Sequence, residues 1–345
     1  MGFRSLFSSW FYPPEVVLGE QFNFGNREIL VASNNLNPDT FFMGLLQHGW
    51  YSSQALRPIP IVRNKNFSIY PIFTWSERQR NLLLELGYPR VHTVGSPWAH
   101  LLQACHIDPE KSEGPVIKDS PELSQGKKLL FFPSHSVPGS QISHSANMDL
   151  LREISSCDSI TVCLFWLDFV DPSIRKYYEA FGCELQCVGY RGSAGGETPW
   201  SPAGGRLTFL PNLLDLMLSH DLVAVEETTT TFWYAASLKK QIIIVPPSGD
   251  FTWWGDSTES PQRYKKIDNS SFLEEVSTDL GTLATLEIID VSNELLNIAL
   301  SELGWNETHR LKTMSLEKRL ISALPLASDL IVPAREYISS FESTK

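Results

Sequence analysis

Short runs of β-branched and aromatic residues alternate with longer amphipathic stretches along this chain, and this alternation limits the folds it can adopt. In the first half we expect strands at 28–33, 68–75 and 91–97, and a helix over 76–88 with Ser76 as its N-cap. Strands separated by helices favour a parallel sheet, because a parallel pair needs a long crossover connection. The first half is therefore predicted to be α/β.

A second alternating series begins at residue 128. It predicts strands at 128–134, 159–167, 183–189, 222–227 and 241–247, and helices at 148–155, 173–182, 207–220 and 228–240. Two such series indicate an α/β protein with two Rossmann-like, doubly wound domains that face each other across a cleft.

The boundary between the two series lies in the segment 107–127, which contains three Pro and two Gly and shows little periodicity. We therefore expect an N-terminal domain, a linker, a C-terminal domain and a final helix that packs back on the N-terminal domain. Their predicted limits are 1–110, 111–127, 128–325 and 326–345. A length of 345 residues agrees with two domains of ordinary size.

The charge balance excludes one class of partner. Lys and Arg number 28 and Asp and Glu number 39, which gives a net charge of −11. A protein that tracks nucleic-acid phosphates presents a basic face, and this sequence contains no basic run. We therefore expect no nucleic-acid partner, whereas a small bound anion needs only local dipoles and a few hydrogen-bond donors.

The cysteines and the N-terminus bear on localisation. The five cysteines are odd in number and no pair has C-x-x-C spacing, so we expect free thiols and a cytoplasmic protein. No signal-peptide core and no run of about 20 apolar residues is present. Two roles stay open for the apolar side chains near the start, namely packing on the body or peripheral contact with the inner face of a membrane: Phe3, Leu6, Phe7, Trp10 and Phe11.

The most informative stretch is LVAVEETTTTFWYAASLKKQIIIVPP, which covers 222–247. A predicted strand is followed by two acidic residues and a Thr cluster that opens a helix. Short hydroxyl residues at a helix start place N–H and O–H donors on one small target, and the helix dipole favours an anion there. Ordinary N-capping is the alternative. The candidate donor-binding residues are Glu226, Glu227, Thr228, Thr229 and Thr230.

A second candidate patch is the loop in 131–145, which follows the first strand of the second series. Ligands of open α/β sheets bind at the carboxyl ends of such strands. The candidate residues are Ser134, His135, Ser136 and Gly139, together with Arg191 in VGYRG, which could pair with a phosphate. A surface turn is the alternative. Phe165-Trp166 supplies an aromatic face, for which we expect core packing.

The third patch is Gln47-His48-Gly49-Trp50. The His48 imidazole could remove a proton from an acceptor hydroxyl, and Gly49 would let the backbone approach a substrate. A structural histidine is the alternative. Asp39, in the polar segment SNNLNPDT, is the second candidate for a catalytic base.

The stretch 222–247 resembles the donor-binding domain of GT-B glycosyltransferases, whose pattern is often written S-S-x-x-x-E-A-L-x-x-G-K-P-V-I. Here Tyr234-Ala235 stands in place of Glu-Ala, and Lys239-Lys240-Gln241 in place of Gly-Lys-Pro. A cluster without that Glu is more similar to CMP-sugar transferases and CDP-glycerol-type polymer transferases. His48-Gly49 also resembles the W-H-G motif of the CDP-glycerol family, with Gln47 in place of its Trp.

The resemblance implies an inverting transferase that moves a sugar from a CMP-, CDP- or UDP-linked donor to a glycan or lipid-linked acceptor in surface polysaccharide synthesis. No metal or other cofactor is expected, because the sequence contains no D-x-D, no H-x-x-x-H and no cysteine cluster. Two alternatives stay open: a sugar-nucleotide epimerase on the same scaffold, and a non-catalytic ligand-binding protein with a GT-B-like fold.

Overall fold

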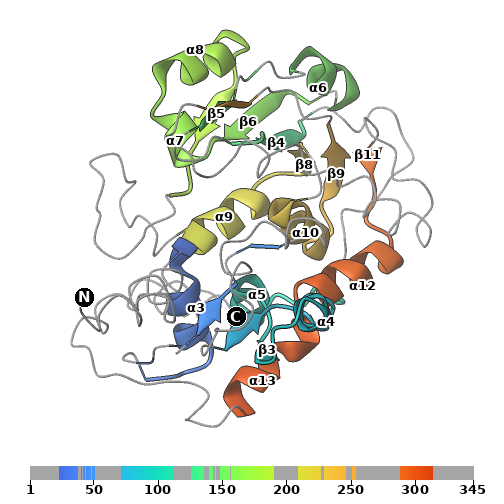
Figure 1. The fold of residues 1–345 in the computed structure, drawn as a ribbon. Coiled ribbons are helices and arrows are strands. Elements are labelled where there is room, and N and C mark those ends of the chain that lie inside the picture. The colour runs from blue at the N-terminus through green and yellow to red at the C-terminus, as the bar shows by residue number, and fades with distance from the viewer. Residues whose placement is uncertain are drawn as a thin grey trace, which may run out of the picture.

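A computed structural model describes most of the predicted elements. The described residues are 23–37, 40, 42, 44–47, 49–50, 71–111, 126–135, 140–142, 144, 148–155, 157–189, 209–226, 229–245, 251–253 and 288–313. They contain a three-stranded parallel sheet in the N-terminal half and a mainly parallel six-stranded sheet in the C-terminal half, with helices packed around both sheets (Figure 1). The predicted α/β class is confirmed.

The C-terminal half contains a six-stranded sheet in the order β11-β9-β8-β4-β6-β7. Its strands are β4 (Lys128–Phe132), β6 (Ser159–Cys163), β7 (Glu184–Gln186), β8 (Leu222–Val225), β9 (Gln241–Ile244) and β11 (Ile288–Ile289). The first five are parallel, and β11 pairs antiparallel with β9. Numbered along the chain from β4, the strand order across the sheet is 3-2-1-4-5-6, which is the Rossmann order.

Helices cover both faces of this sheet, so its inner strands are buried on both sides. Side chains on one face, such as Leu130 and Val223, pack with α9 (Phe209–Leu218) and α10 (Thr230–Ser237). Those on the other face, such as Phe131, pack with α6 (Met148–Ser155) and α8 (Pro172–Ala180). Figure 1 shows α9 and α10 between the six-stranded sheet and the N-terminal half.

The N-terminal half contains three parallel strands in the order β1-β2-β3. They are β1 (Leu45–Leu46), β2 (Ile72–Thr74) and β3 (Val91–Thr93), and the helices beside them are α3 (Asn26–Ser33), α4 (Glu77–Glu85) and α5 (Pro97–Ala104). Ser76 accepts a hydrogen bond from the Gln79 N–H at 3.3 Å, so the predicted N-cap of α4 is confirmed. The predicted strand over 91–97 is shorter than expected, because α5 begins at Pro97.

The predicted strand at 28–33 is wrong, because these residues lie in α3. Seven of the eight α3 residues are buried, so apolar residues are not confined to one stripe and no helical period is visible in the sequence. A short apolar run cannot be assigned from its pattern alone. Gly25, at φ +70°, begins the helix in a conformation that glycine adopts readily.

Two predictions in the second half also need correction. The strand predicted over 159–167 ends at Cys163, and a short helix, α7 (Trp166–Phe169), follows it. The loop predicted over 131–145 contains β5 (Ser140–Ile142), which pairs antiparallel with β10 (Phe251–Trp253). This pairing joins segments far apart in sequence, and a local pattern cannot reveal it.

After β11 the chain returns to the N-terminal half through α12 (Asn293–Glu302), η6 (Trp305–Glu307) and α13 (Thr308–Thr313) (Figure 1). The Ser96 N–H donates to the Leu303 carbonyl at 2.8 Å. At Gly304 a Cβ would lie 1.8 Å from the Trp75 carbonyl oxygen, so only glycine fits this close approach. The final helix predicted within 326–345 lies outside the described residues.

The two halves share one apolar cluster, and α10 lies at its centre. The rings of Trp98 and Tyr234 stack at 4.2 Å with an interplanar angle of 9°, and the Trp98 indole N–H donates to Ser237 Oγ at 3.0 Å. Trp50 packs on Trp233 with ring centroids 5.5 Å apart. One helix of the C-terminal half thus supplies much of the contact with the N-terminal half.

Two observations bear on the earlier expectations about thiols and membranes. All five cysteines lie among the described residues and none forms a disulfide. In the described part of the chain, no helix combines the length and the apolar character needed to cross a membrane.

Candidate functional site

The chain direction across the six-stranded sheet reverses between β4 and β8. After β4 the chain crosses toward β6, whereas after β8 it crosses in the other direction toward β9. Such a switch point opens a crevice at the carboxyl ends of the two strands. Ser134 follows β4 and Glu226 follows β8, and the Ser134 N–H donates to Glu226 Oε2 at 3.0 Å. The fold thus brings two of the predicted donor-binding segments into contact.

A cavity of about 410 Å³ lies at this switch point, and residues of both halves line it. Its volume falls within the range of small-molecule sites. Seven aromatic side chains line it: Phe24, Trp50, Phe132, Phe165, Trp166, Phe209 and Tyr234. The polar part of the lining comes from Asn26, Ser134, His135, Glu226, Thr229, Thr230 and Thr231. The cavity is therefore apolar over much of its wall, with a small set of hydrogen-bonding groups.

The N-terminus of α10 forms one polar wall of this cavity. Thr229 is the N-cap residue, yet its side chain makes no capping hydrogen bond. Thr229 is an exposed residue and lines the cavity beside Thr230 and Thr231. The N-capping alternative requires a hydrogen bond from a backbone N–H of α10 to the Thr229 side chain, and this bond is not formed. Backbone N–H groups in the first turn of a helix attract anions when a side chain does not satisfy them.

Gly49 and Trp50, which follow His48 in the sequence, lie against this wall. His48 itself is outside the described residues, but its neighbours Gly49 and Trp50 line the cavity. The Trp50 N–H donates to Thr230 Oγ1 at 2.9 Å, and a Cβ on Gly49 would lie 3.3 Å from the same oxygen. The N-terminal half thus approaches the start of α10 closely at residues 49 and 50.

Side-chain contacts hold Gly49 and Trp50 in place. The Gln47 amide donates to the Gly49 carbonyl at 2.7 Å and accepts the Trp75 N–H at 3.0 Å. The Trp50 indole N–H donates to Glu302 Oε2 at 2.5 Å, and Arg78 Nη2 donates to the same oxygen at 2.6 Å. The Arg78 guanidinium also lies over the Trp50 ring, 5.5 Å from its centroid. Helices α4 and α12 therefore hold Trp50 in place through Arg78 and Glu302.

Glu226 is the acidic residue in the described lining, and it is only 3% exposed. Burial is the main cause of a raised pKa at Tyr178, and the negative charge of Glu226 raises it further. Tyr178 therefore stays protonated near neutral pH and can donate to His144 Nδ1, which is 2.8 Å away. His144 Nε2 lies 3.7 Å from Asp168 Oδ1, so His144 belongs to a buried network outside the lining.

The described lining contains no Lys or Arg side chain. Within this part of the chain, a bound phosphate would meet backbone N–H groups and hydroxyls rather than a cation. Arg191, the cation predicted to pair with a phosphate, is outside the described residues. Among the described residues, no group of three or more His, Cys, Asp or Glu side chains is arranged to hold a metal ion.

The structure brings five of the predicted site residues together around one cavity: Ser134, His135, Glu226, Thr229 and Thr230. The other seven lie outside the described residues: Asp39, His48, Ser136, Gly139, Arg191, Glu227 and Thr228. The roles of all twelve residues stay predictions.

Sequence reasoning missed part of the cavity wall. Phe165 and Trp166 are only partly buried and line the cavity, whereas the sequence suggested core packing. The His135 ring lies 4.4 Å from the Phe165 ring. Asn26 was missed because its segment was assigned from its apolar run alone. The Gly25-Asn26 pair just before that run was the available signal for a helix start.

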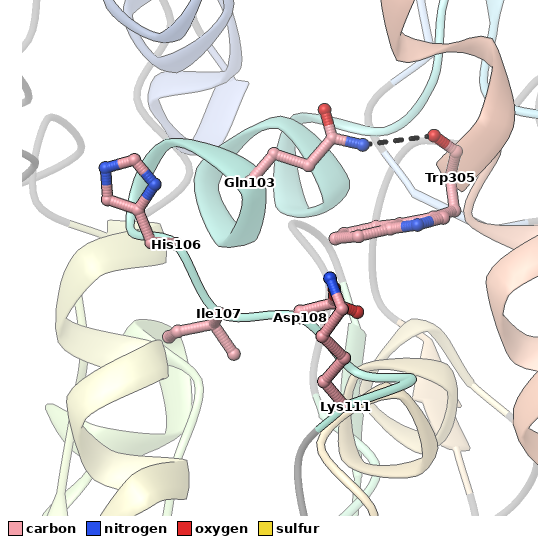
Figure 2. A pocket seen from close by; sticks show the side chains of 6 residues that line it. All are labelled: Gln103, His106, Ile107, Asp108, Lys111 and Trp305. Carbon is pink, nitrogen blue, oxygen red and sulfur yellow. Dashed lines mark hydrogen bonds and ion pairs between the residues drawn. The ribbon is translucent and has the colours of Figure 1, made fainter.

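A second, wider cavity of about 590 Å³ lies near the start of the predicted linker (Figure 2). Three of its polar side chains are paired: Asp108 pairs with Lys111 at 2.8 Å, and the Gln103 amide donates to the Trp305 carbonyl at 3.2 Å. Lys111 is largely exposed. Because this cavity is open and has no strand end of the six-stranded sheet in its described lining, the switch-point cavity is the stronger candidate.

No protein-family model matches this chain, and no curated protein matches it. Solved structures do show similarity. The wall teichoic acid polymerase TagF is 10% identical with a TM-score of 0.31, and the match covers 79% of this chain and 51% of the TagF chain. The chain thus spans about half of TagF. HepE of Anabaena, in complex with UDP and glucose, is 13% identical with a TM-score of 0.30 over 76% of this chain and 67% of that one. The UDP-GlcNAc 2-epimerase of Methanocaldococcus jannaschii is 15% identical with a TM-score of 0.28, and the match covers 71% of this chain and 61% of the epimerase chain.

Proposed function

We propose that this protein is a GT-B-type glycosyltransferase that uses a CMP-, CDP- or UDP-linked sugar as its donor. One observation carries the proposal. The start of α10 with its non-capping Thr229, the Ser134–Glu226 contact and the Gly49-Trp50 loop all line a single cavity at the switch point of a Rossmann sheet. This combination provides an anion site, a hydroxyl-binding carboxylate and an approach from the opposite half.

The donor nucleotide would bind on the C-terminal half. Its phosphates would accept hydrogen bonds from the first turn of α10 and the Thr229 hydroxyl, and Ser136, Gly139, Arg191, Glu227 and Thr228 would complete the site. The aromatic rings of Phe165 and Trp166 suit stacking of a base or a sugar. Glu226 can accept hydrogen bonds from sugar hydroxyls.

The acceptor would enter from the N-terminal half. Its hydroxyl oxygen attacks the anomeric carbon of the donor, and the bond from that carbon to the phosphate oxygen breaks. The electron pair leaves with the nucleotide phosphate, and the hydroxyl proton passes to His48, with Asp39 as the alternative base. Attack from the side opposite the leaving phosphate inverts the anomeric configuration.

The acceptor is proposed to be a glycan or a lipid-linked glycan of a surface polysaccharide. The protein would then work in the cytoplasm, with peripheral contact at the inner face of the membrane. Helix N–H groups and hydroxyls would stabilise the leaving phosphate in place of a divalent ion, so no metal is required.

Calorimetry with CMP, CDP and UDP, alone and as sugar conjugates, tests the donor. We expect one nucleotide class to bind and to raise the melting temperature in a concentration-dependent way. Transfer to an acceptor should survive EDTA. Absence of binding by all three nucleotide classes would refute the proposed function. Loss of activity in EDTA that Mn²⁺ restores would refute only the metal independence.

A sugar-nucleotide epimerase is the second candidate, because the buried Glu226 carboxylate lines the cavity and such an enzyme needs acidic groups there. Incubation of the nucleotide-sugar without any acceptor separates the two enzymes. An epimerase would convert the sugar under these conditions, whereas a transferase would leave its configuration unchanged. A non-catalytic binding protein would bind the nucleotide-sugar and never release the nucleotide from the sugar.

A further inference from the structure

Asn26 is a buried polar residue in the wall that the N-terminal half contributes to the cavity. It is the first residue of α3, is 2% exposed and lines the switch-point cavity. Its Nδ2 atom is buried and has no hydrogen-bond partner among the described residues. Burial of an amide without a hydrogen bond is unfavourable, so an apolar side chain of similar size would suit the ligand-free fold better. Nδ2 itself is covered in the ligand-free fold, so a ligand in the cavity would supply the missing acceptor once the Asn26 amide turns toward it.

The local backbone holds Asn26 in this position. Phe24 and Gly25 both have positive φ values, +57° and +70°, and lead directly into α3. A non-glycine residue such as Phe24 adopts this conformation only when its surroundings require it. The Phe24 ring packs on Phe209 with centroids 4.7 Å apart, and both rings line the cavity. Asn26 therefore lines the cavity from α3, next to Phe24 in the sequence, whereas Thr229 lines it from the start of α10.

The charges around Asn26 favour an uncharged ligand group at this wall. The next two residues of α3, Arg27 and Glu28, are fully buried and form an ion pair at 3.5 Å, so the helix start carries no net charge. Glu226 lines the same cavity, and the described lining contains no Lys or Arg. Among the described residues a second anion would therefore lack a compensating cation, whereas a hydroxyl or ring oxygen can accept from Nδ2 without one.

We infer that Asn26 binds the sugar of the nucleotide-sugar donor, by donating a hydrogen bond from Nδ2 to a hydroxyl or ring oxygen of that sugar. This inference rests on the proposed function. The aromatic rings of the same wall would cover the apolar face of the sugar ring. Asn26 would then add affinity for the conjugated sugar and none for the nucleotide alone.

Calorimetry on wild type, Asn26→Ala and Asn26→Leu tests this, with the free nucleotide and its sugar conjugates as ligands. The matched control is Asn34→Ala, because the buried Asn34 amide donates to the Leu30 carbonyl at 2.8 Å and Asn34 is not part of the described lining. We expect both Asn26 variants to bind the free nucleotide as wild type does and the preferred conjugate about 5- to 30-fold more weakly. Asn34→Ala should bind both ligands unchanged.

The melting temperature without ligand provides an independent readout. Because Nδ2 has no partner among the described residues, Asn26→Leu should melt at the wild-type temperature or above it. A clear loss of stability in Asn26→Leu would indicate a structural role and overturn the inference. If the Asn26 variants bound the nucleotide and the conjugate with equally reduced affinity, or bound the conjugate as wild type does, the inference about Asn26 would also be overturned. The proposed function would stand in both cases. Failure of every nucleotide to bind wild type would refute the proposed function and this inference together.

Discussion

The Trp50 backbone N–H donates a hydrogen bond to Thr230 Oγ1 at 2.9 Å, and this bond joins a residue two positions after His48 in the sequence to the first residue of α10. The two residues are 180 positions apart in the sequence. Because Thr230 acts here as an acceptor, its hydroxyl keeps its own proton to donate to a ligand. The contact brings the proposed catalytic loop and the proposed phosphate site to the same wall of one cavity.

Thr229→Val should weaken nucleotide binding with little loss of stability. The Thr229 hydroxyl makes no capping hydrogen bond, so its removal leaves the folded protein almost unaffected. It would remove one hydrogen bond to a charged phosphate, and we expect the dissociation constant to rise about tenfold. Thr74→Val, in β2 and away from the cavity, is the matched control and should leave affinity unchanged. Unaltered calorimetric affinity in Thr229→Val would exclude this phosphate position.

His48→Ala should abolish most turnover and preserve donor binding. Loss of a general base typically lowers the rate by about 10²- to 10⁴-fold with ground-state binding largely intact. The measurements are turnover at saturating substrate and nucleotide affinity on the same preparation. Near-normal turnover in His48→Ala, together with an inactive Asp39→Asn, would assign the base to Asp39 instead.

Glu302→Ala should destabilise the protein and also slow turnover. Glu302 is buried, accepts hydrogen bonds from the Trp50 indole and from Arg78, and thereby anchors the loop next to His48. Removal of the carboxylate leaves both donors without this partner, and we expect a loss of about 2–4 kcal/mol in the free energy of unfolding. Urea denaturation and the turnover number measure the two effects. Glu302→Gln keeps an acceptor oxygen, so its free energy of unfolding and its turnover number should fall less than those of Glu302→Ala.

The free energy of unfolding should fall as the pH rises from about 9 toward 12. Burial raises the pKa of the Cys105 thiol from 9.0 to about 12, and it also raises the pKa values of Cys163, Tyr178 and Tyr234. In this pH range the unfolded chain loses protons that the folded chain retains, so folding becomes less favourable. Urea denaturation at pH 8 and pH 10 measures the difference. Equal stability at both values would contradict the burial of these groups.

Elements with a strong local signal could be predicted from the sequence. Ser76 and the apolar spacing after it indicated α4, and short, largely apolar runs indicated the buried strands β4, β6, β8 and β9. The site at Ser134 and Glu226 could be predicted for a related reason. Both follow strands of one parallel sheet, and the carboxyl ends of neighbouring parallel strands lie at one edge.

The tertiary structure decided what depends on contacts between distant segments. The apolar run at 28–33 became α3 because it is buried on nearly all sides, and the pairing of β5 with β10 joins residues that no local pattern connects. The position of Asn26 in the cavity follows from that helix. Local sequence sets backbone preference and periodicity, which are short-range properties of the chain. Burial and the closing of a cavity depend on which distant side chains pack together, and that is a property of the whole fold.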